Sequence, residues 1–310
     1  MLKMIQRIKN VAAILIVALL FSCSSNKSGS DPKQLVIAAI PGDDVTVTLH
    51  HVENFSRFLE KKLDMKVNFY KATDYAAVIE AMKTGKIHVA RLGPFSYVLA
   101  SQKAGAEVIV ALGTKSGEFH SYQSMLLTYP GSGINSLEDA QNKASDISFS
   151  FVDPASTSGH LVPRAYLNSI EIEPEENFKQ VTFSTSHAAS LLMVKSHKVD
   201  MAAANNISYR RLTEQGKVVD GDFNILWKSA PIVPDPWAVS KTLSPELKEK
   251  IREAFVALPK EDPEAWKEYI SYQYKGDPIL DSLIYISAND SVYDNIRAIA
   301  NNIDFDRLGN

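Results

Sequence analysis

Four short segments of the chain place hydroxyl, phenol or imidazole side chains where a predicted strand gives way to a predicted helix. They are Thr73-Asp74-Tyr75, Gly93-Pro94-Phe95-Ser96-Tyr97, Asp153-Pro154-Ala155-Ser156-Thr157-Ser158-Gly159 and Ser184-Thr185-Ser186-His187. The N-terminus of a helix presents backbone N–H groups without intrahelical partners and a partial positive charge, which together can bind an anion. Each segment is therefore a candidate anion-binding position.

The strongest candidate contains three consecutive hydroxyl residues, Ser156, Thr157 and Ser158, at the start of a predicted helix and directly after a buried strand. Their O–H and backbone N–H groups can point at one oxyanion. Because this loop contains no Lys or Arg, we expect a tetrahedral oxyanion to be held there by neutral donors, which select by geometry rather than by net charge. The alternative is simple helix capping by Ser156 or Thr157.

The other segments offer phenols and an imidazole. Tyr75 and Tyr97 can each supply a phenol donor or an apolar wall, but Tyr75 shares a helix face with Val78 and Met82, so core packing is the alternative. His187 follows three hydroxyl residues, and its alternative role is that of a cap or a core residue.

The elements that would position these residues follow an α/β pattern. Short apolar runs alternate with segments of helical period, which is typical of mainly parallel sheets. We expect strands at 35–40, 66–70, 87–92, 107–113, 125–129, 147–152, 181–183 and 199–203. We expect helices at 49–63, 74–83, 95–103, 157–168, 187–196, 245–258, 263–274 and 291–301, with Thr73 capping the second and a capping box at Ser136 and Asp139.

The first 22 residues have the pattern of a removed signal peptide, with a basic start and an apolar run at 11–21. That run is about half the roughly 20 residues that span a bilayer. Cys23, the only cysteine, ends a segment (LFSC) that resembles the lipobox of bacterial lipoproteins, with residues 23–33 as lipidated Cys and flexible tether. The alternative is an ordinary thiol after an uncleaved anchor. We expect a lipoprotein outside the cytoplasm, in the periplasm or at the cell surface.

Composition excludes several classes of protein. The 310 residues are 45% hydrophobic and 22% charged, which is typical of a globular chain. A formal net charge of −3, which becomes −6 without residues 1–22, argues against nucleic acid as a partner. A single cysteine excludes a disulfide framework and a zinc-finger or iron–sulfur site. We expect no cofactor and no bound metal.

Taken together, the motifs resemble a known family. Residues 74–82 (DYAAVIEAM), 93–97 (GPFSY), 153–159 (DPASTSG) and 233–237 (VPDPW) occur in this order. With the lipoprotein signal, the chain resembles the phosphate/phosphite/phosphonate substrate-binding proteins of ABC importers over residues 34–260. The resemblance implies a type II periplasmic binding protein fold with the ligand cleft between two lobes joined by two crossing strands. Lobe one would comprise 34–124 plus 237–310, and lobe two 125–236.

The resemblance also implies the site and the partners. The implied ligand-binding residues are Tyr75, Tyr97, Ser124, Ser156, Thr157, Ser158, His187 and Asp235. Ser124 is the weakest of these candidates. The implied partners are a small phosphorus oxyanion, the ABC permease and its ATPase subunit, and a membrane through the N-terminal lipid. We expect a monomer with no enzymatic activity of its own.

Asp235 would make the site selective. A carboxylate repels an oxyanion unless that anion has a proton to donate, as a P–OH group does and sulfate at neutral pH does not.

The chain departs from the family pattern at two positions. His88 stands where the family has Asp, and the segment 205–208 (NNIS) lacks a carboxylate for an ammonium group. The second departure favours phosphite, phosphate or a small alkylphosphonate over an aminoalkylphosphonate.

Three other functions stay open at this point. Ser156 and His160 could form a nucleophile–base pair of a hydrolase, although the chain has no G-x-S-x-G, H-E-x-x-H or P-loop motif. A binding protein of this fold could carry a sulfonate, or ferric ion on Tyr75, Tyr97, His187 and Asp235. The protein could also present its ligand to a sensor kinase rather than to a permease.

Overall fold

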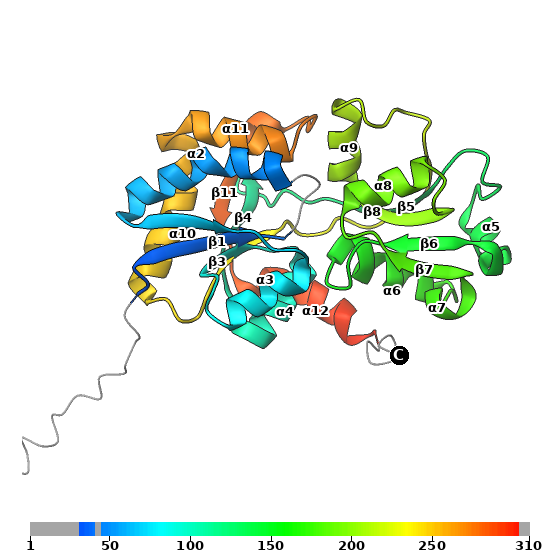
Figure 1. Ribbon diagram of the computed structural model, residues 1–310, viewed down its shortest axis with the longest axis horizontal. Helices are drawn as coiled ribbons and strands as arrows, with labels where there is room; N and C mark the ends of the chain where they lie inside the picture. Colours follow the sequence, from blue (N-terminus) through cyan, green and yellow to red (C-terminus); the bar gives the residue numbers. More distant parts are fainter. Residues whose placement is uncertain (1–30, 41–44, 304–310) are drawn as a thin grey trace, which may run out of the picture.

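Two α/β lobes lie side by side in the computed structural model of the chain (Figure 1). The structure describes residues 31–40 and 45–303, so the predicted signal peptide at 1–22 and Cys23 lie outside the described residues. Each lobe is one sheet with helices on both faces. No helix within the described ranges combines the length and the apolar character needed to cross a membrane.

Lobe one is built on a six-stranded sheet of order β11-β4-β10-β3-β1-β2. Its strands are β1 (Gln34–Ala39), β2 (Lys66–Tyr70), β3 (Val89–Arg91), β4 (Glu107–Thr114), β10 (Pro236–Val239) and β11 (Leu283–Ser287). Its helices are α2 (Val45–Leu63), α3 (Tyr75–Lys83), α4 (Pro94–Ala104), α10 (Pro245–Glu261), α11 (Pro263–Gln273) and α12 (Asp294–Asn301). Successive β1 residues face opposite sides, so Leu35 and Ile37 pack under α2, α10 and α11, whereas Ala38 packs against α3 and α4.

Lobe two is built on a five-stranded sheet of order β7-β6-β8-β5-β9. Its strands are β5 (Ser124–Thr128), β6 (Ser148–Phe151), β7 (Gln180–Phe183), β8 (Met201–Asn205) and β9 (Asn224–Lys228). Its helices are α5 (Leu137–Asn142), α6 (Val162–Ser169), α7 (Pro174–Asn177), α8 (His187–Lys195) and α9 (Asn206–Glu214). Because β8 is buried on both faces, Ala202 and Ala204 pack with α8 and α9, while Met201 and Ala203 pack with α6.

The chain passes between the sheets twice, through 115–123 and 229–235. The two crossings pair at Tyr122 and Ile232, whose backbones exchange N–H···O bonds of 3.1 and 2.7 Å. After the second crossing the chain enters lobe one as β10, which lies antiparallel between β3 and β4. The C-terminal segment therefore completes the lobe that the N-terminal segment began.

The α/β architecture is confirmed, but the expectation of mainly parallel sheets is wrong. The parallel pairs are β1–β2, β1–β3, β6–β7 and β6–β8, whereas the strands next to the crossings pair antiparallel. The periodicity also missed β9, β10, β11 and α9. The cap of α3 is Asp74, whose Oδ1 accepts from the Ala77 N–H at 2.7 Å, and not Thr73. The cap at Ser136 is confirmed.

Candidate ligand-binding site

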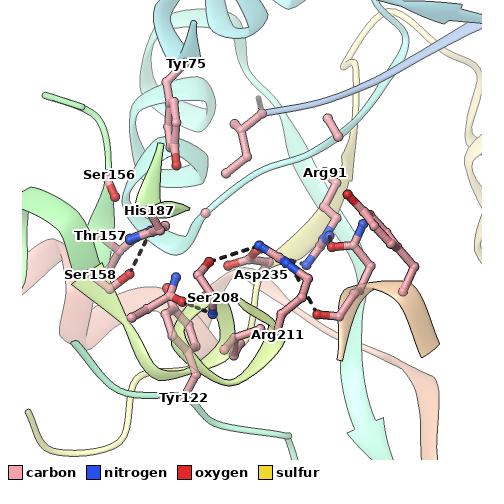
Figure 2. A pocket seen from close by; sticks show the side chains of 17 residues that line it. Tyr75, Arg91, Tyr122, Ser156, Thr157, Ser158, His187, Ser208, Arg211 and Asp235 are labelled. Atoms are coloured by element: carbon pink, nitrogen blue, oxygen red, sulfur yellow. Dashed lines mark hydrogen bonds and ion pairs between the residues drawn. The ribbon is translucent and has the colours of Figure 1, made fainter. Parts of the chain in front are cut away.

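A pocket lies between the two lobes, next to the crossing segments (Figure 2). Lobe one lines the pocket from β1, α3, β3 and the end of α11. Lobe two lines it from α8, α9 and the loop that carries Ser156, Thr157 and Ser158, which we call the hydroxyl loop. Tyr122 and Asp235 reach the pocket from the two crossing segments. The side chains with polar atoms that line it are Tyr75, Arg91, Tyr122, Ser156, Thr157, Ser158, His187, Asn205, Ser208, Arg211, Asp235, Tyr272 and Gln273.

The hydroxyl loop follows β6 and opens a helix. Ser156 is the N-cap, and its Oγ accepts from the Gly159 N–H at 3.1 Å. One π-helical turn (Thr157–Leu161) then leads into α6. This turn packs closely on the end of the strand, because a Cβ built on Gly159 would overlap Val152. The three hydroxyls are thus presented by a backbone that only glycine permits at residue 159.

We expect Gly159→Ala to lower the free energy of unfolding by about 1–3 kcal/mol, the usual cost of overpacking a tight site. The new methyl group would push the loop away from Val152 and displace Ser156, whose Oγ lies 2.8 Å from the position that the added Cβ would take. Urea denaturation of the variant and the wild type measures the difference. A midpoint equal to that of the wild type would show that the loop relaxes freely.

The loop also joins the lobes to each other. Thr157 Oγ1 accepts from the Phe95 N–H at 2.8 Å, and Ser96 Oγ donates to the Ala155 carbonyl at 2.8 Å. These contacts hold the N-terminus of α4 against the loop across the cleft. Ser156 and Thr157 therefore each accept one bond through the hydroxyl oxygen. The O–H of Ser156 lies beside the Tyr75 phenol and that of Thr157 beside the Tyr122 phenol, so each can turn from a phenol to a ligand.

His187 lies beside the loop as a neutral imidazole. Its Nε2 is 3.4 Å from Ser158 Oγ, and its buried Nδ1 makes no hydrogen bond to the described residues. Burial lowers the pKa of His187 to about 3. A neutral imidazole has one N–H, so His187 can donate one hydrogen bond to an anion without adding charge.

The low pKa of His187 predicts a pH effect on stability. In the unfolded chain His187 has a pKa near 6.5, whereas in the folded protein its pKa is about 3. Between these pH values the unfolded chain therefore binds a proton that the folded protein does not bind. The free energy of unfolding should therefore fall as pH drops below 6.5, by up to about 1.4 kcal/mol per pH unit. Without ligand, His187→Asn should lose stability less steeply than the wild type when urea melts at about pH 7 and pH 5 are compared. Equal slopes would contradict the assignment.

Tyr75 and Tyr122 line the pocket beside the hydroxyl loop, but Tyr97 does not. Burial, and then the charges of nearby carboxylates, raise the pKa values of Tyr75 and Tyr122 well above the ordinary range, so both keep their protons to donate. The phenol of Tyr97 donates to Asp290 Oδ1 at 2.5 Å, and its ring packs on Tyr293 with centroids 4.8 Å apart. Tyr97 does not line the pocket and belongs to the core under α12.

Ser124 also lies outside the pocket lining. It is fully buried, and its Oγ donates to the Ser158 carbonyl at 2.6 Å. Its hydroxyl therefore fixes the backbone of the hydroxyl loop rather than facing the cleft.

The pocket also contains charged side chains, which the sequence of the hydroxyl loop did not predict. Arg91 on β3 donates to Asp235 Oδ2 at 3.2 Å, and Arg211 on α9 donates to Ser208 Oγ at 3.1 Å. Burial raises the pKa of Asp235, and the Arg91 charge opposes that shift. The expectation of neutral donors concerned the hydroxyl loop, and the rest of the pocket lining adds two guanidinium groups and one carboxylate to it.

The sequence reasoning missed Arg91, Arg211 and Tyr122 as pocket residues. Arg91 could have been noticed as a charged residue inside an apolar predicted strand. Arg211 lies on a helix that the periodicity did not predict, and Tyr122 lies on a crossing whose partner is 110 residues away in the chain. Local patterns contain no signal for the last two.

Both ring nitrogens of His160 are hydrogen-bonded within a buried network that does not include Ser156. Its Nδ1 lies 2.8 Å from the Pro154 carbonyl and its Nε2 accepts from Arg164 Nε at 2.8 Å, which fixes the Nδ1–H tautomer. Burial, reinforced by the Arg164 charge, lowers the pKa of His160 to about 4. Arg164 continues the network to Glu175. Within the described residues, no group of three or more His, Cys, Asp or Glu side chains could hold a metal ion.

The chain is similar in sequence to known proteins. Residues 37–278 match the family model described as "ABC transporter, phosphonate, periplasmic substrate-binding protein". The phosphonates-binding periplasmic protein of Escherichia coli is 33% identical over 202 residues, which span 65% of this chain and 59% of that relative. The phosphate-import protein PhnD of Mycolicibacterium smegmatis is 30% identical over 79% of each chain.

A solved structure shares the fold. PhnD1 of Prochlorococcus marinus, in complex with methylphosphonate, superposes with a TM-score of 0.73 at 21% identity, covering 87% of this chain and 98% of that one. A mixed α/β chain of two lobes with a polar cleft between them is thus matched both in fold and, over most of its length, in sequence. The chain belongs to the family of periplasmic substrate-binding proteins of phosphonate ABC transporters.

Proposed function

We propose that this protein captures a phosphorus oxyanion, such as phosphate, phosphite or a small phosphonate, in the pocket between its lobes and delivers it to an ABC permease. The observation that carries the proposal is the convergence of Ser156, Thr157 and Ser158 with His187 at one wall of that pocket. The relatives support the ligand class, since one is named for phosphonates and another for phosphate import. The chain performs no chemistry on the ligand, and the energy comes from the ATPase subunit of the transporter.

Each group in the pocket has a distinct role. The three hydroxyls and His187 donate hydrogen bonds to the oxygens of the anion, and the phenols of Tyr75 and Tyr122 donate from the sides. Asp235 accepts the proton of a P–OH group. Because the three hydroxyls and the two phenols are buried when the lobes meet, and His187 is partly buried, each hydrogen bond acts in a medium of lower dielectric constant than water.

The capture cycle requires the lobes to separate. The contacts of Thr157 with Phe95 and of Ser96 with Ala155 would break in the open form and reform around the ligand. We further propose that Cys23 carries the lipid that holds the protein at the membrane surface outside the cytoplasm, and that one copy acts alone.

Calorimetric titration and thermal shifts with phosphite, phosphate, methylphosphonate, sulfate and taurine test the proposal. A phosphorus ligand at 100 times its dissociation constant should stabilise the fold by about 2.7 kcal/mol. Ser158→Ala should weaken binding by about tenfold or more, because a hydrogen bond to a charged group is lost. Ser116→Ala, on an exposed turn, is the matched control and should bind as the wild type does. Binding of taurine or sulfate with no response to any phosphorus oxyanion would contradict the proposal.

A further inference from the structure

The turn that follows α11 in lobe one lies against α9 of lobe two, outside the pocket lining (Figure 1). Gly276 in this turn has a φ of +79°, and a Cβ built on it would lie 2.7 Å from Glu214 Cγ and 3.1 Å from Arg210 Cγ. Lys275 Nζ donates to the Glu214 carbonyl at 3.3 Å, where α9 ends. The backbone of lobe one therefore approaches the last turn of α9 so closely that no side chain fits between them.

Asp277, at the end of this turn, bonds to groups from two other parts of the chain. Its Oδ2 lies 3.0 Å from His120 Nε2 on the first crossing, and it forms an ion pair with Arg210 of α9. The Asp277 side chain is 3% exposed, and its Oδ1 accepts from the Ile279 N–H at 3.1 Å. Burial raises the pKa of Asp277, but the hydrogen bonds that the carboxylate accepts outweigh burial and lower the pKa to about 2. The carboxylate is therefore charged at neutral pH.

Of the two side-chain partners of Asp277, one belongs with lobe one and the other with lobe two. His120 is held to lobe one, because its N–H donates to the Leu112 carbonyl of β4 at 3.0 Å and its ring packs on Tyr274 with centroids 5.3 Å apart. Arg210 moves with lobe two, and its side chain is 27% exposed, so it can return to water when α9 moves away. Asp277 then keeps the imidazole of His120, which avoids the large cost of a buried carboxylate without a partner. The ion pair can therefore break and reform.

We propose that Arg210 and Asp277 form a latch that closes when the lobes meet around the ligand and that raises the affinity without touching the ligand. The inference rests on the proposed function, since it assumes that a ligand in the pocket draws the lobes together. A ligand that binds only the closed form has an apparent affinity proportional to the fraction of protein that is closed. A contact made only in the closed form therefore strengthens the binding of every ligand by the same factor, while the pocket residues select among ligands.

Calorimetric titration of Arg210→Gln with phosphite and methylphosphonate tests the latch. Both dissociation constants should rise by about threefold to tenfold with their ratio unchanged, because a partly exposed ion pair of the closed form is lost. Stopped-flow measurements should assign most of the change to faster dissociation. Arg210→Lys should restore part of the affinity because the charge returns. Arg252→Gln is the matched control, since Arg252 pairs with Glu249 within α10, and it should bind as the wild type does.

Two further measurements separate a latch from a general contribution to folding. Without ligand the lobes are apart and the pair is broken, so the urea midpoint of ligand-free Arg210→Gln should equal that of the wild type, whereas the midpoint with ligand should be lower. Asp277→Asn should weaken binding as Arg210→Gln does, and the double variant should bind no more weakly than either single variant.

Four results would overturn the latch: unchanged dissociation constants in Arg210→Gln, a changed ratio between the two ligands, additive effects in the double variant, or an equal fall of the urea midpoint with and without ligand. Each of these leaves the proposed function intact. Failure of the wild type to bind any phosphorus oxyanion would instead overturn the proposed function.

Discussion

Replacing Asp235 by asparagine should remove most of the protein's discrimination between phosphorus oxyanions and sulfate. The wild-type carboxylate can only accept hydrogen bonds, so it favours an anion with a P–OH proton and leaves an acceptor without a donor when it faces sulfate. Sites that hydrogen-bond a ligand proton reject analogues without it by about 10⁴-fold, so we expect the ratio of the phosphite and sulfate affinities to fall by about 100-fold or more. The asparagine amide offers N–H donors that sulfate can use.

Calorimetric titration of both anions in wild type and variant measures this ratio. The substitution Asp281→Asn makes the same chemical change at an exposed residue outside the pocket lining and should leave the ratio unaltered. Since burial raises the pKa of Asp235, lowering the pH should protonate it earlier than an ordinary aspartate and weaken the discrimination of the wild type as well. If Asp235→Asn rejects sulfate as strongly as the wild type does, Asp235 is not the selective acceptor.

The sequence predicted the hydroxyl loop well because the loop is local. A buried strand, three hydroxyl residues and a helical period are adjacent in the chain, so strand, cap and helix follow from neighbouring residues. The structure brings Ser156, Thr157, Ser158, His187, Tyr75 and Asp235 into one pocket lining. His187 and Tyr75 each lie at the first position of a helix next to the cleft, which is why strand-to-helix junctions were informative.

The residues that were missed or misplaced depend on contacts between distant segments. Tyr97 occupies a junction similar to that of Tyr75, but its ring is covered by the C-terminal segment through Asp290 and Tyr293. Helix α12 begins nearly 200 residues later in the chain, so no local sequence pattern predicts this packing. Similarly, β10 pairs antiparallel with β3 and β4 because the chain returns from lobe two, and this return brings Asp235 beside Arg91.

Arg164 supports the hydroxyl loop through a network of buried hydrogen bonds. It is 1% exposed, its Nη1 donates to Glu175 Oε2 at 2.7 Å, its Nε donates to His160, and its guanidinium lies 4.7 Å from the Phe151 ring centre. His160 in turn donates to the Pro154 carbonyl inside the loop. A surface carboxylate is therefore connected through two buried side chains to the backbone that presents Ser156 and its neighbours.

Arg164→Ala should lower the free energy of unfolding by about 2–4 kcal/mol, because it leaves a cavity and removes the hydrogen-bond donor to a buried imidazole. Urea denaturation measures this loss, and calorimetry below the melting temperature should show weaker phosphonate binding because the loop at Pro154 is no longer fixed. Arg252→Ala is the control, since Arg252 pairs with Glu249 on the exposed surface of α10 and should cost at most about 1 kcal/mol. Equal losses in the two variants would mean that the buried network contributes no more than a surface ion pair, and the loop would then owe its shape to Gly159 and Ser124 alone.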